Sequence, residues 1–474
     1  MDVTTLATIV LLGGFAILML LRVPVTFSLL IATLASAFVN GTNLTVMIRQ
    51  MIDGVNNFSL LAIPFFIVMG EIMGAGNISE KIVDLANLIV GRFRGGLAYV
   101  NVLDSMFFGG ISGSAVADVS SLGSVVIPMM KKQGYDEDFA VGLTVTTACQ
   151  GVLIPPSHNM VIYALAAGGG ISIGTLFIAG AIPGVLLGVC LMVLCFFMSN
   201  IYKFPKGFII GTKGYVRWIK FTKSDSNKFS VEKVENSWII WHTPLFNLHL
   251  GPCIKIILDA ILPMFTLVII MGGIAMGIFT ATESAAIACI YTFILTFFVF
   301  RSVKLRDLGT ILKNSLKTLA IVLGLIATAK AFAYMMTDLR IPAKITMALI
   351  SLTDNKYILL FIINILLLLL GCFMDMAPLI MIMTPILLPV VTSPTVGMHP
   401  IHFGVMLIFN LAIGLCTPPV GSALYVGCAI GKTTLEKTAV KTLPMFAVMV
   451  FTLLLVTYVP FFTLWLPTVL GLML

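Results

Sequence analysis

Long apolar runs with almost no charge dominate this chain of 474 residues. Three of the longest are Thr5–Leu21, Leu176–Met198 and Met445–Leu474. A helix needs about 20 apolar residues to cross the hydrocarbon core of a bilayer, so several of these runs are long enough or nearly so. Only 10% of the residues are charged, against about a quarter in a soluble domain. We therefore expect an all-α, multi-pass integral membrane protein with about ten to twelve transmembrane helices.

The formal net charge of +8 arises mainly in residues 201–255, where nine basic residues stand against three acidic ones. The positive-inside rule places this connection in the cytoplasm. Its mixture of basic and aromatic residues favours an interfacial amphipathic segment, with a flexible cytoplasmic loop as the alternative. The pattern is not typical of a nucleic-acid-binding surface, so we expect no nucleic-acid partner. Cysteine and histidine spacings match no zinc or disulfide motif, and we expect no cofactor.

The chain resembles itself at an offset near 263 residues. Gly151–Ser157 falls on Gly414–Val420, and each segment contains a Pro-Pro pair. Upstream, Met73, Ile78 and Lys81 match Met336, Ile341 and Lys344. We expect two related repeats, 1–200 and 256–474, on either side of the connection 201–255. Transporters commonly contain such repeats, often of inverted topology, and bind solute and ions between them.

Each repeat contains an apolar segment that we predict to be a re-entrant hairpin. The first, at about 105–130, has Gly, Ser and Ala at its centre, and we place its tip near residues 112–114. The second covers about 371–390, and we expect Pro128 and Pro389 to end the two hairpins. The alternative for the first segment is an ordinary helix with small residues for close packing.

Each repeat also contains a predicted broken helix, at about 139–166 and about 403–430. Two successive prolines remove two amide donors and push the preceding residue out of the helical conformation. Carbonyls freed by the break can bind a cation, and the restarting half-helix turns its positive end toward an anion. The alternative is a simple proline kink. Two breaks at equivalent positions favour the binding site.

Polar residues near these breaks and hairpins are candidate substrate contacts, because polar groups at membrane depth are functional by default. We predict that the substrate contacts are Ser157, Asn159, Asp118, Asp375 and Thr147. A structural hydrogen bond is the alternative for Asp118 and Asp375, as for Glu71, Asp104 and Glu283. No cluster of Lys or Arg lies beside the hairpin tips, so the charge of an acidic solute must be met by Na+, backbone amides and helix N-termini.

Seven blocks in order resemble the large membrane subunit of tripartite ATP-independent periplasmic (TRAP) transporters, the DctM family. They are FFGGISGSAVADVSSLGSVVIPMM, KKQGYDEDFAVG, GVLIPPS, GIFTATESAA, FMDMAP with TPILLP, HPIHFGV and GLCTPPVG. The resemblance covers nearly the whole chain except about Phe204–Gly251. It implies an elevator mechanism, in which a transport domain with both hairpins and both broken helices slides against a scaffold domain.

The resemblance also implies two Na+ sites, transferred here by motif. The first would use Ser112, Ser114, Gly151, Ile154 and Pro156. The second would use Cys372, Gly414, Thr417 and Val420, largely through carbonyl oxygens. His158 and Cys372 depart from the family pattern, since a hydrophobic and a hydroxyl residue are usual there.

We therefore expect a Na+-coupled importer of a small organic acid in the bacterial inner membrane. Sialic acid, a C4-dicarboxylate and a sugar acid all remain open as substrates. The family implies two partners, a periplasmic substrate-binding protein and a separate small four-helix membrane subunit. One alternative is a stand-alone ion-coupled organic anion carrier that needs no binding protein. A membrane enzyme would need a convergent catalytic set, which the sequence does not contain, so we expect no enzymatic activity.

Overall fold

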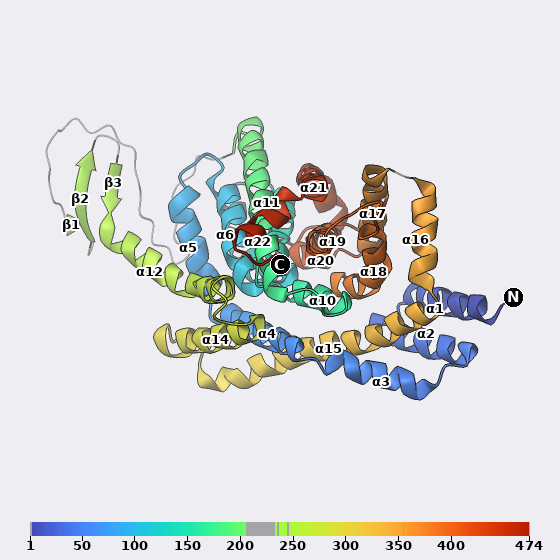
Figure 1. Ribbon diagram of the computed structural model, residues 1–474. Helices are drawn as coiled ribbons and strands as arrows, with labels where there is room; N and C mark the ends of the chain where they lie inside the picture. Colours follow the sequence, from blue (N-terminus) through green and yellow to red (C-terminus); the bar gives the residue numbers. More distant parts are fainter. Residues whose placement is uncertain (1, 205–232, 235–236, 244–245, 354, 474) are drawn as a thin grey trace.

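The computed structural model describes residues 2–204, 233–234, 237–243, 246–353 and 355–473 (Figure 1). The helices before the central connection are α1 (Val3–Leu20), α2 (Val25–Asn40), α3 (Leu44–Val55), η1 (Phe58–Leu61), α4 (Ala62–Ala75), α5 (Ile78–Val90), α6 (Gly96–Ser112), α7 (Ala115–Lys132), α8 (Glu137–Ala148), α9 (Gln150–Leu153), α10 (His158–Ala166) and α11 (Ile173–Ile201).

The helices after the connection are α12 (Leu250–Leu267), η2 (Val268–Gly272), α13 (Gly273–Ala275), α14 (Ala281–Ile294), η3 (Leu295–Val299), η4 (Leu305–Asp307), α15 (Leu308–Asp338), α16 (Ile341–Leu352), α17 (Lys356–Gly371), α18 (Met376–Val391), α19 (Pro400–Gly414), α20 (Ser422–Gly431), α21 (Leu435–Tyr458) and α22 (Phe461–Val469).

Among the described residues the regular elements are helices, apart from three short strands in the central connection. These are β1 (Lys233–Val234), β2 (Ser237–Thr243) and β3 (Phe246–His249), which pair antiparallel in that order. The sequence predicted helices alone. Residues 205–232, 235–236 and 244–245 lie outside the described residues, so the amphipathic segment expected there stays a prediction.

Seven helical stretches in the described part of the chain are long and apolar enough to cross a membrane, or eight if the bent unit α8–α10 is one span. They are Val3–Leu20, Phe58–Ala75, Ile173–Ile201, Ile254–Ala275, Ala281–Val299, Leu305–Asp338 and Leu435–Tyr458. Five further apolar helices have only 10–17 residues, fewer than the ~20 that a full span requires. In the described part of the chain the full spans are thus fewer than the ten to twelve predicted. Three of the shorter helices, Met376–Val391, Pro400–Gly414 and Ser422–Gly431, lie where the second hairpin and the second broken helix were predicted.

Two groups of helices are visible in Figure 1. The long α15 packs on α2, α3 and α4, while α1 packs on α2 and α14 packs on α4. These helices run along one side of the molecule, at the bottom of Figure 1. Above them stand α6, α11 and α21 with the paired short helices. The short helices of the two halves interlock, because α10 packs on α18 and α20 packs on α7.

Helices in the two halves begin at regularly spaced positions. The starts of α5 and α16 are 263 residues apart, as are those of α8 and α19; α10 and α20 start 264 residues apart, and α11 and α21 start 262 apart. The prediction that Pro128 and Pro389 end the hairpins is wrong, since both lie inside helices, α7 and α18. Neighbouring groups in a membrane protein can satisfy a backbone that proline interrupts.

Buried polar pairs recur at the same offset. Thr147 Oγ1 donates to Asn101 Oδ1 at 3.0 Å between α8 and α6. In the other half, Asn410 Nδ2 donates to Asn364 Oδ1 at 2.9 Å between α19 and α17. Both Asn364 and Asn410 lie 263 residues after their counterparts. The Cys149 thiol donates to the carbonyl oxygen of Ala412, again 263 residues later, at 3.1 Å.

A pair of glycines brings two backbones together in each half. A Cβ added at Gly109 would collide with the backbone of Gly151. A Cβ added at Gly414 would lie 2.7 Å from the carbonyl oxygen of Gly371. These contacts press the first helix of each hairpin, α6 or α17, against the broken helix that follows. Only glycine leaves room for this approach.

Substituting Gly414→Ala should destabilise the protein, because the added methyl group has no space against backbone that cannot rotate away. Overpacking of this kind costs about 1–3 kcal/mol. We expect a lower melting temperature for the purified full-length variant in detergent. Gly309→Ala is the matched control, since a Cβ there has no neighbour within 4 Å. Equal melting temperatures for the two variants would contradict the close approach.

Candidate functional site

The first hairpin turns at Gly113, between α6 and α7. Gly113 has φ +63°, a left-handed conformation that glycine adopts without strain. Ser114 is the N-cap of α7, and its N–H donates to Ser112 Oγ at 3.2 Å. Ser112 Oγ in turn donates to Asp118 Oδ1. The turn predicted at 112–114 is confirmed as a helix–turn–helix, and its two helices extend beyond the predicted 105–130.

The first broken helix passes directly beside this turn. Helix α9 ends at Leu153, α10 begins at His158, and the helix direction changes by 52° across the break. A Cβ at Gly113 would collide with the carbonyl oxygen of Pro156. Among the described residues, no donor bonds the carbonyls of Ile154, Pro155 and Pro156. The break therefore leaves unpaired carbonyl oxygens buried beside the turn that Ser112 and Ser114 flank.

The second hairpin turns between Gly371 and Met376, at the start of the predicted 371–390. Its first helix, α17, begins at Lys356, well before that range. The prediction began too late because the uninterrupted leucine-rich run of α17 gives no sign that it belongs to a hairpin. The N–H of Val420 donates to the carbonyl oxygen of Cys372 at 3.1 Å. This bond joins the hairpin turn to the second break, between α19 and α20.

Side chains of the second turn and break also meet. The Cys372 thiol lies 3.5 Å from Thr417 Oγ1 and 3.2 Å from the carbonyl oxygen of Leu368. Thr417 Oγ1 donates to the carbonyl oxygen of Gly414 at 3.0 Å. The four predicted second-site residues are thus neighbours. Unlike those at the first break, several of their carbonyls already accept protein hydrogen bonds.

One cavity of about 1190 Å³ is lined by residues from both halves of the chain. The first half contributes Ser112 and Ser114 from the hairpin turn, and His158 and Asn159 from the start of α10. The second half contributes Asp375, which is exposed at the start of α18. Ser422 Oγ of α20 donates to Asp375 Oδ1 at 3.4 Å. The positive end of α10 therefore opens into a space shared by both hairpin turns.

The other predicted residues lie behind the cavity wall. Asp118 and Ser157 are fully buried, beneath the first turn and break. Thr147 is also fully buried, and its hydroxyl bonds Asn101 and accepts from Ser105 at 3.0 Å. Because Thr147 joins α8 to α6 away from the cavity, we withdraw it as a substrate contact. The predicted sodium residues outside the wall are Gly151, Ile154, Pro156, Cys372, Gly414, Thr417 and Val420.

The cavity wall is acidic. Glu71, Glu80 and Asp307 line it together with Asp375, and the described lining residues include no Lys or Arg. The sequence singled out Glu71, since it interrupts an apolar run. Glu80 and Asp307 lie at helix starts, where acidic residues are ordinary, so no signal could have identified them.

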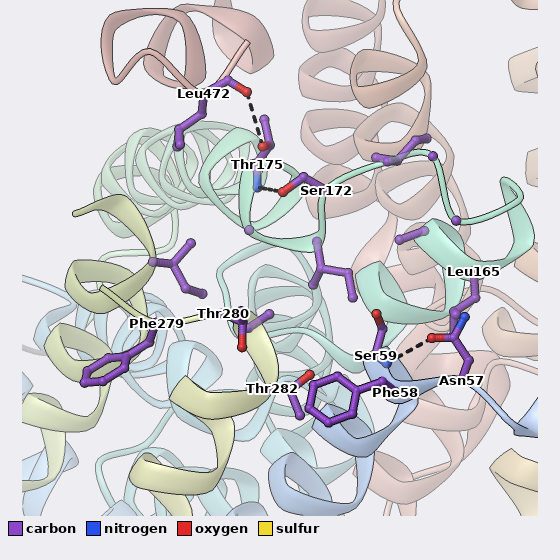
Figure 2. Close-up of a pocket in the computed structure, with 18 residues that line it drawn as sticks. Asn57, Phe58, Ser59, Leu165, Ser172, Thr175, Phe279, Thr280, Thr282 and Leu472 are labelled. Atoms are coloured by element: carbon purple, nitrogen blue, oxygen red, sulfur yellow. Dashed lines mark hydrogen bonds between the residues drawn. The ribbon is translucent and has the colours of Figure 1, made fainter. Parts of the chain in front are cut away.

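A second cavity, of about 470 Å³, contains no charged residue among its described lining (Figure 2). Thr280 in its wall begins α14 by a capping box with Glu283, whose Oε2 accepts from the Thr280 N–H at 2.8 Å. This explains Glu283 as a structural residue. In Figure 2 the Thr175 hydroxyl donates to the carbonyl oxygen of Leu472 at 3.4 Å. The Thr280 hydroxyl thus caps a helix, whereas the Thr175 hydroxyl joins two segments that are distant in the sequence.

Comparison with known proteins identifies relatives over the whole chain. The family model described as "Tripartite ATP-independent periplasmic transporter, DctM component" matches residues 12–462. The sialic acid TRAP transporter large permease protein SiaM of Vibrio cholerae is 35% identical over 96% of this chain and 97% of its own length. The isethionate TRAP transporter permease protein DctMQ of Oleidesulfovibrio alaskensis is 35% identical over 95% of this chain and 65% of its length. These relatives are transport permeases rather than enzymes.

A solved structure shares the fold. MtrF of Neisseria gonorrhoeae, described as one of a class of antimetabolite efflux pumps, superposes with a TM-score of 0.58. The match covers 89% of this chain and 84% of MtrF, at 13% sequence identity. At this identity the likeness concerns the fold alone.

The contact between the second turn and the second break can be tested by cross-linking. Replacing Thr417→Cys puts a second sulfur where Oγ1 lies 3.5 Å from Cys372 Sγ. Mild oxidation should then join residues 372 and 417 in a disulfide that mass spectrometry of the digested protein detects. Thr392→Cys, at an exposed position after α18, is the control and should give no bond to Cys372. Absence of the 372–417 cross-link would contradict the arrangement.

Proposed function

This chain belongs to the DctM family of TRAP transporters, and we propose that it is the large membrane subunit of a Na+-coupled importer of a small organic acid. The observation that carries the proposal is the meeting of two hairpin turns and a restarting half-helix on one cavity. Unpaired carbonyls lie at the first break, and the described cavity wall contains no Lys or Arg. A carboxylate bound there must be neutralised by something other than a basic side chain.

We propose that the two halves are inverted structural repeats. A nearly constant offset between the helix starts, between the Asn101–Thr147 and Asn364–Asn410 pairs, and between the glycine contacts supports this. Cys149 contacts Ala412, its counterpart at the same offset. Counterparts that touch each other are expected beside a pseudo-two-fold axis that relates the two repeats. Each hairpin is then re-entrant, entering and leaving the membrane on one side.

The first Na+ site lies where the first turn meets the first break. Hydroxyl oxygens of Ser112 and Ser114 and carbonyls of Gly151, Ile154 and Pro156 would surround the ion. Oxygen ligands of this kind suit a hard cation. Support comes from the contact of Gly113 with the Pro156 carbonyl and from the absence of donors to the break carbonyls among described residues. These oxygens lack partners that an ion would supply.

The second Na+ site uses Cys372, Gly414, Thr417 and Val420. Its residues are neighbours through the Val420–Cys372 and Thr417–Gly414 hydrogen bonds. Each carbonyl oxygen has a second lone pair that can face an ion. At Cys372 the backbone carbonyl remains a ligand, although a hydroxyl side chain is lacking.

The substrate lies in the cavity between these sites. We propose that Asn159 and the start of α10 bind its carboxylate, that Ser157 supports the break from behind, and that Asp375 contacts a hydroxyl or amine of the solute. Asp118 holds Ser112 in place and faces the first ion rather than the substrate. Relatives named for sialic acid, C4-dicarboxylates and 2,3-diketo-L-gulonate support this choice, and sialic acid, C4-dicarboxylates and sugar acids are the candidates.

Transport is proposed to follow an elevator mechanism in the bacterial inner membrane. The hairpins and broken helices would form the moving unit, and the group around α15, α1–α3 and α14 would form the scaffold. A periplasmic binding protein would deliver the substrate, and a separate small four-helix subunit would complete the scaffold. The relative DctMQ, only 65% of which is matched, is longer than the region shared with this chain.

Uptake should depend on the sodium gradient and on Thr417. In proteoliposomes with the small subunit and the loaded binding protein, replacing Na+ with choline should abolish uptake of the cognate acid. Thr417→Val removes an oxygen and keeps the shape of the side chain, so half-maximal uptake should need about tenfold more Na+, equivalent to roughly 1.4 kcal/mol. Thr392→Val, which loses an exposed hydroxyl outside the cavity, should retain the normal sodium dependence.

Uptake that continues equally in choline would contradict sodium coupling. Uptake of free substrate without the binding protein would instead favour the stand-alone carrier. The acid is identified first, by thermal-shift measurements on the binding protein with sialic acid, succinate and gluconate as probes.

A further inference from the structure

Asp104 in α6 is fully buried, and within the described part of the chain neither of its carboxyl oxygens has a hydrogen-bond partner. Its polar neighbours on the same helix are satisfied. Asn101 Nδ2 donates to Thr144 Oγ1 at 2.7 Å, and Ser105 donates to Thr147 at 3.0 Å. Asp104 takes no part in the cavity wall, nor in the turn or the break. The transport mechanism proposed above leaves it without a role.

The fold does not need a carboxyl group at this place. The positions 262 and 263 residues after Asp104 are Leu366 and Leu367 in α17. Leu367 is fully buried, as Asp104 is. The second half thus makes the corresponding packing with leucine. A buried polar group that structure does not require is a candidate for function.

Among the residues that the structure describes, no positive charge is paired with Asp104. The acids whose charge acts on it are Asp84 of α5 and Asp118 of α7. Lys81 of α5 is engaged elsewhere, 3.4 Å from Asp259 of α12 and over the Phe300 ring. Helices α9 and α11 contain no acidic or basic residue. The remaining charged residues on elements packed against α6 are Glu71 of α4, Glu80 of α5, Lys131 and Lys132 of α7, Glu137 and Asp138 of α8, and Lys255 of α12.

An unpaired carboxylate that is fully buried, with two other acids acting on it, is strongly unfavourable. A neutral carboxylic acid avoids both the desolvation of the charge and the repulsion. We propose that Asp104 is a proton-binding site of the transporter, which holds a proton while the hairpin α6–α7 is packed against α5. Loss of that proton to water leaves an unpaired charge behind the hairpin and opens the packing. The first half therefore binds a proton where the second half has an apolar side chain.

The sign of the pH effect follows from this linkage. The packed state binds the proton and the unfolded state releases it, so the contribution to stability is complete below the pKa of a free aspartate, about 4. It is lost progressively as the pH rises, until the packed state itself releases the proton. This pH dependence of stability arises from the packing of α6. A test of it therefore does not rest on sodium coupling or on the identity of the substrate. A failure here leaves the proposed transport function standing.

Infrared difference spectroscopy tests the protonation directly. Spectra of the purified full-length protein and of Asp104→Asn are compared at neutral pH. We expect the variant to lack a carbonyl stretching band of a protonated carboxylic acid. Asp53→Asn, which replaces an exposed aspartate of α3, is the control and should lack the bands of an ionised carboxylate. Loss of ionised carboxylate bands in Asp104→Asn as well would overturn the proposal.

Thermal unfolding at rising pH tests the consequence. The melting temperature of the wild-type protein should fall from neutral to alkaline pH, and Asp104→Asn should show a smaller fall. Asp104→Leu, which copies the second half, should do the same and serves where the asparagine variant does not fold. Asp53→Asn should follow the wild type. Parallel pH profiles for all four proteins would show that no proton at Asp104 is linked to packing.

Discussion

Backbone that the helix breaks leave unsatisfied is the physical constraint on which this structure depends. Hydrocarbon offers no hydrogen bonds, so a broken helix is stable only where protein, water or an ion meets its free groups. The chain places a glycine-rich or acidic turn beside each break, and at the first break a Cβ on Gly113 would collide with the Pro156 carbonyl oxygen. At the first break the carbonyls lack donors among described residues. A cation is the partner that such oxygens suit.

The packing around the breaks shows how the chain holds them in place. Gly109 against Gly151 and Gly371 against Gly414 bring each hairpin to its broken helix, while α10 on α18 and α20 on α7 join the two halves. The arrangement puts both turns on one acidic cavity. Because the described wall lacks Lys and Arg, an organic acid and a cation would have to bind together. Coupling between the two solutes is then a consequence of electrostatics.

Local signals in the sequence predicted the parts of this site that depend on the chain itself. Proline pairs dictate breaks wherever they stand, and the small residues at 112–114 predicted a turn, which the structure confirms. Features that depend on packing were missed. Nothing local shows that α17 belongs to a hairpin or that Thr147 bonds Asn101 rather than a substrate. The Thr280–Glu283 capping box is different, because its i, i+3 spacing is a local signal that identifies Glu283 as a structural residue. The acids Glu80 and Asp307 reach the cavity only through the approach of α5 and η4.

Direct measurement of sodium binding tests the central claim, that paired prolines open the backbone to a cation. The purified full-length protein, without partners, is titrated with radioactive sodium. We expect saturable binding that potassium and choline do not displace, and a loss of bound sodium in the double variant Pro155→Ala, Pro156→Ala, in which the first helix can run through. Unchanged binding in that variant, or no saturable binding by the wild type, would contradict the account.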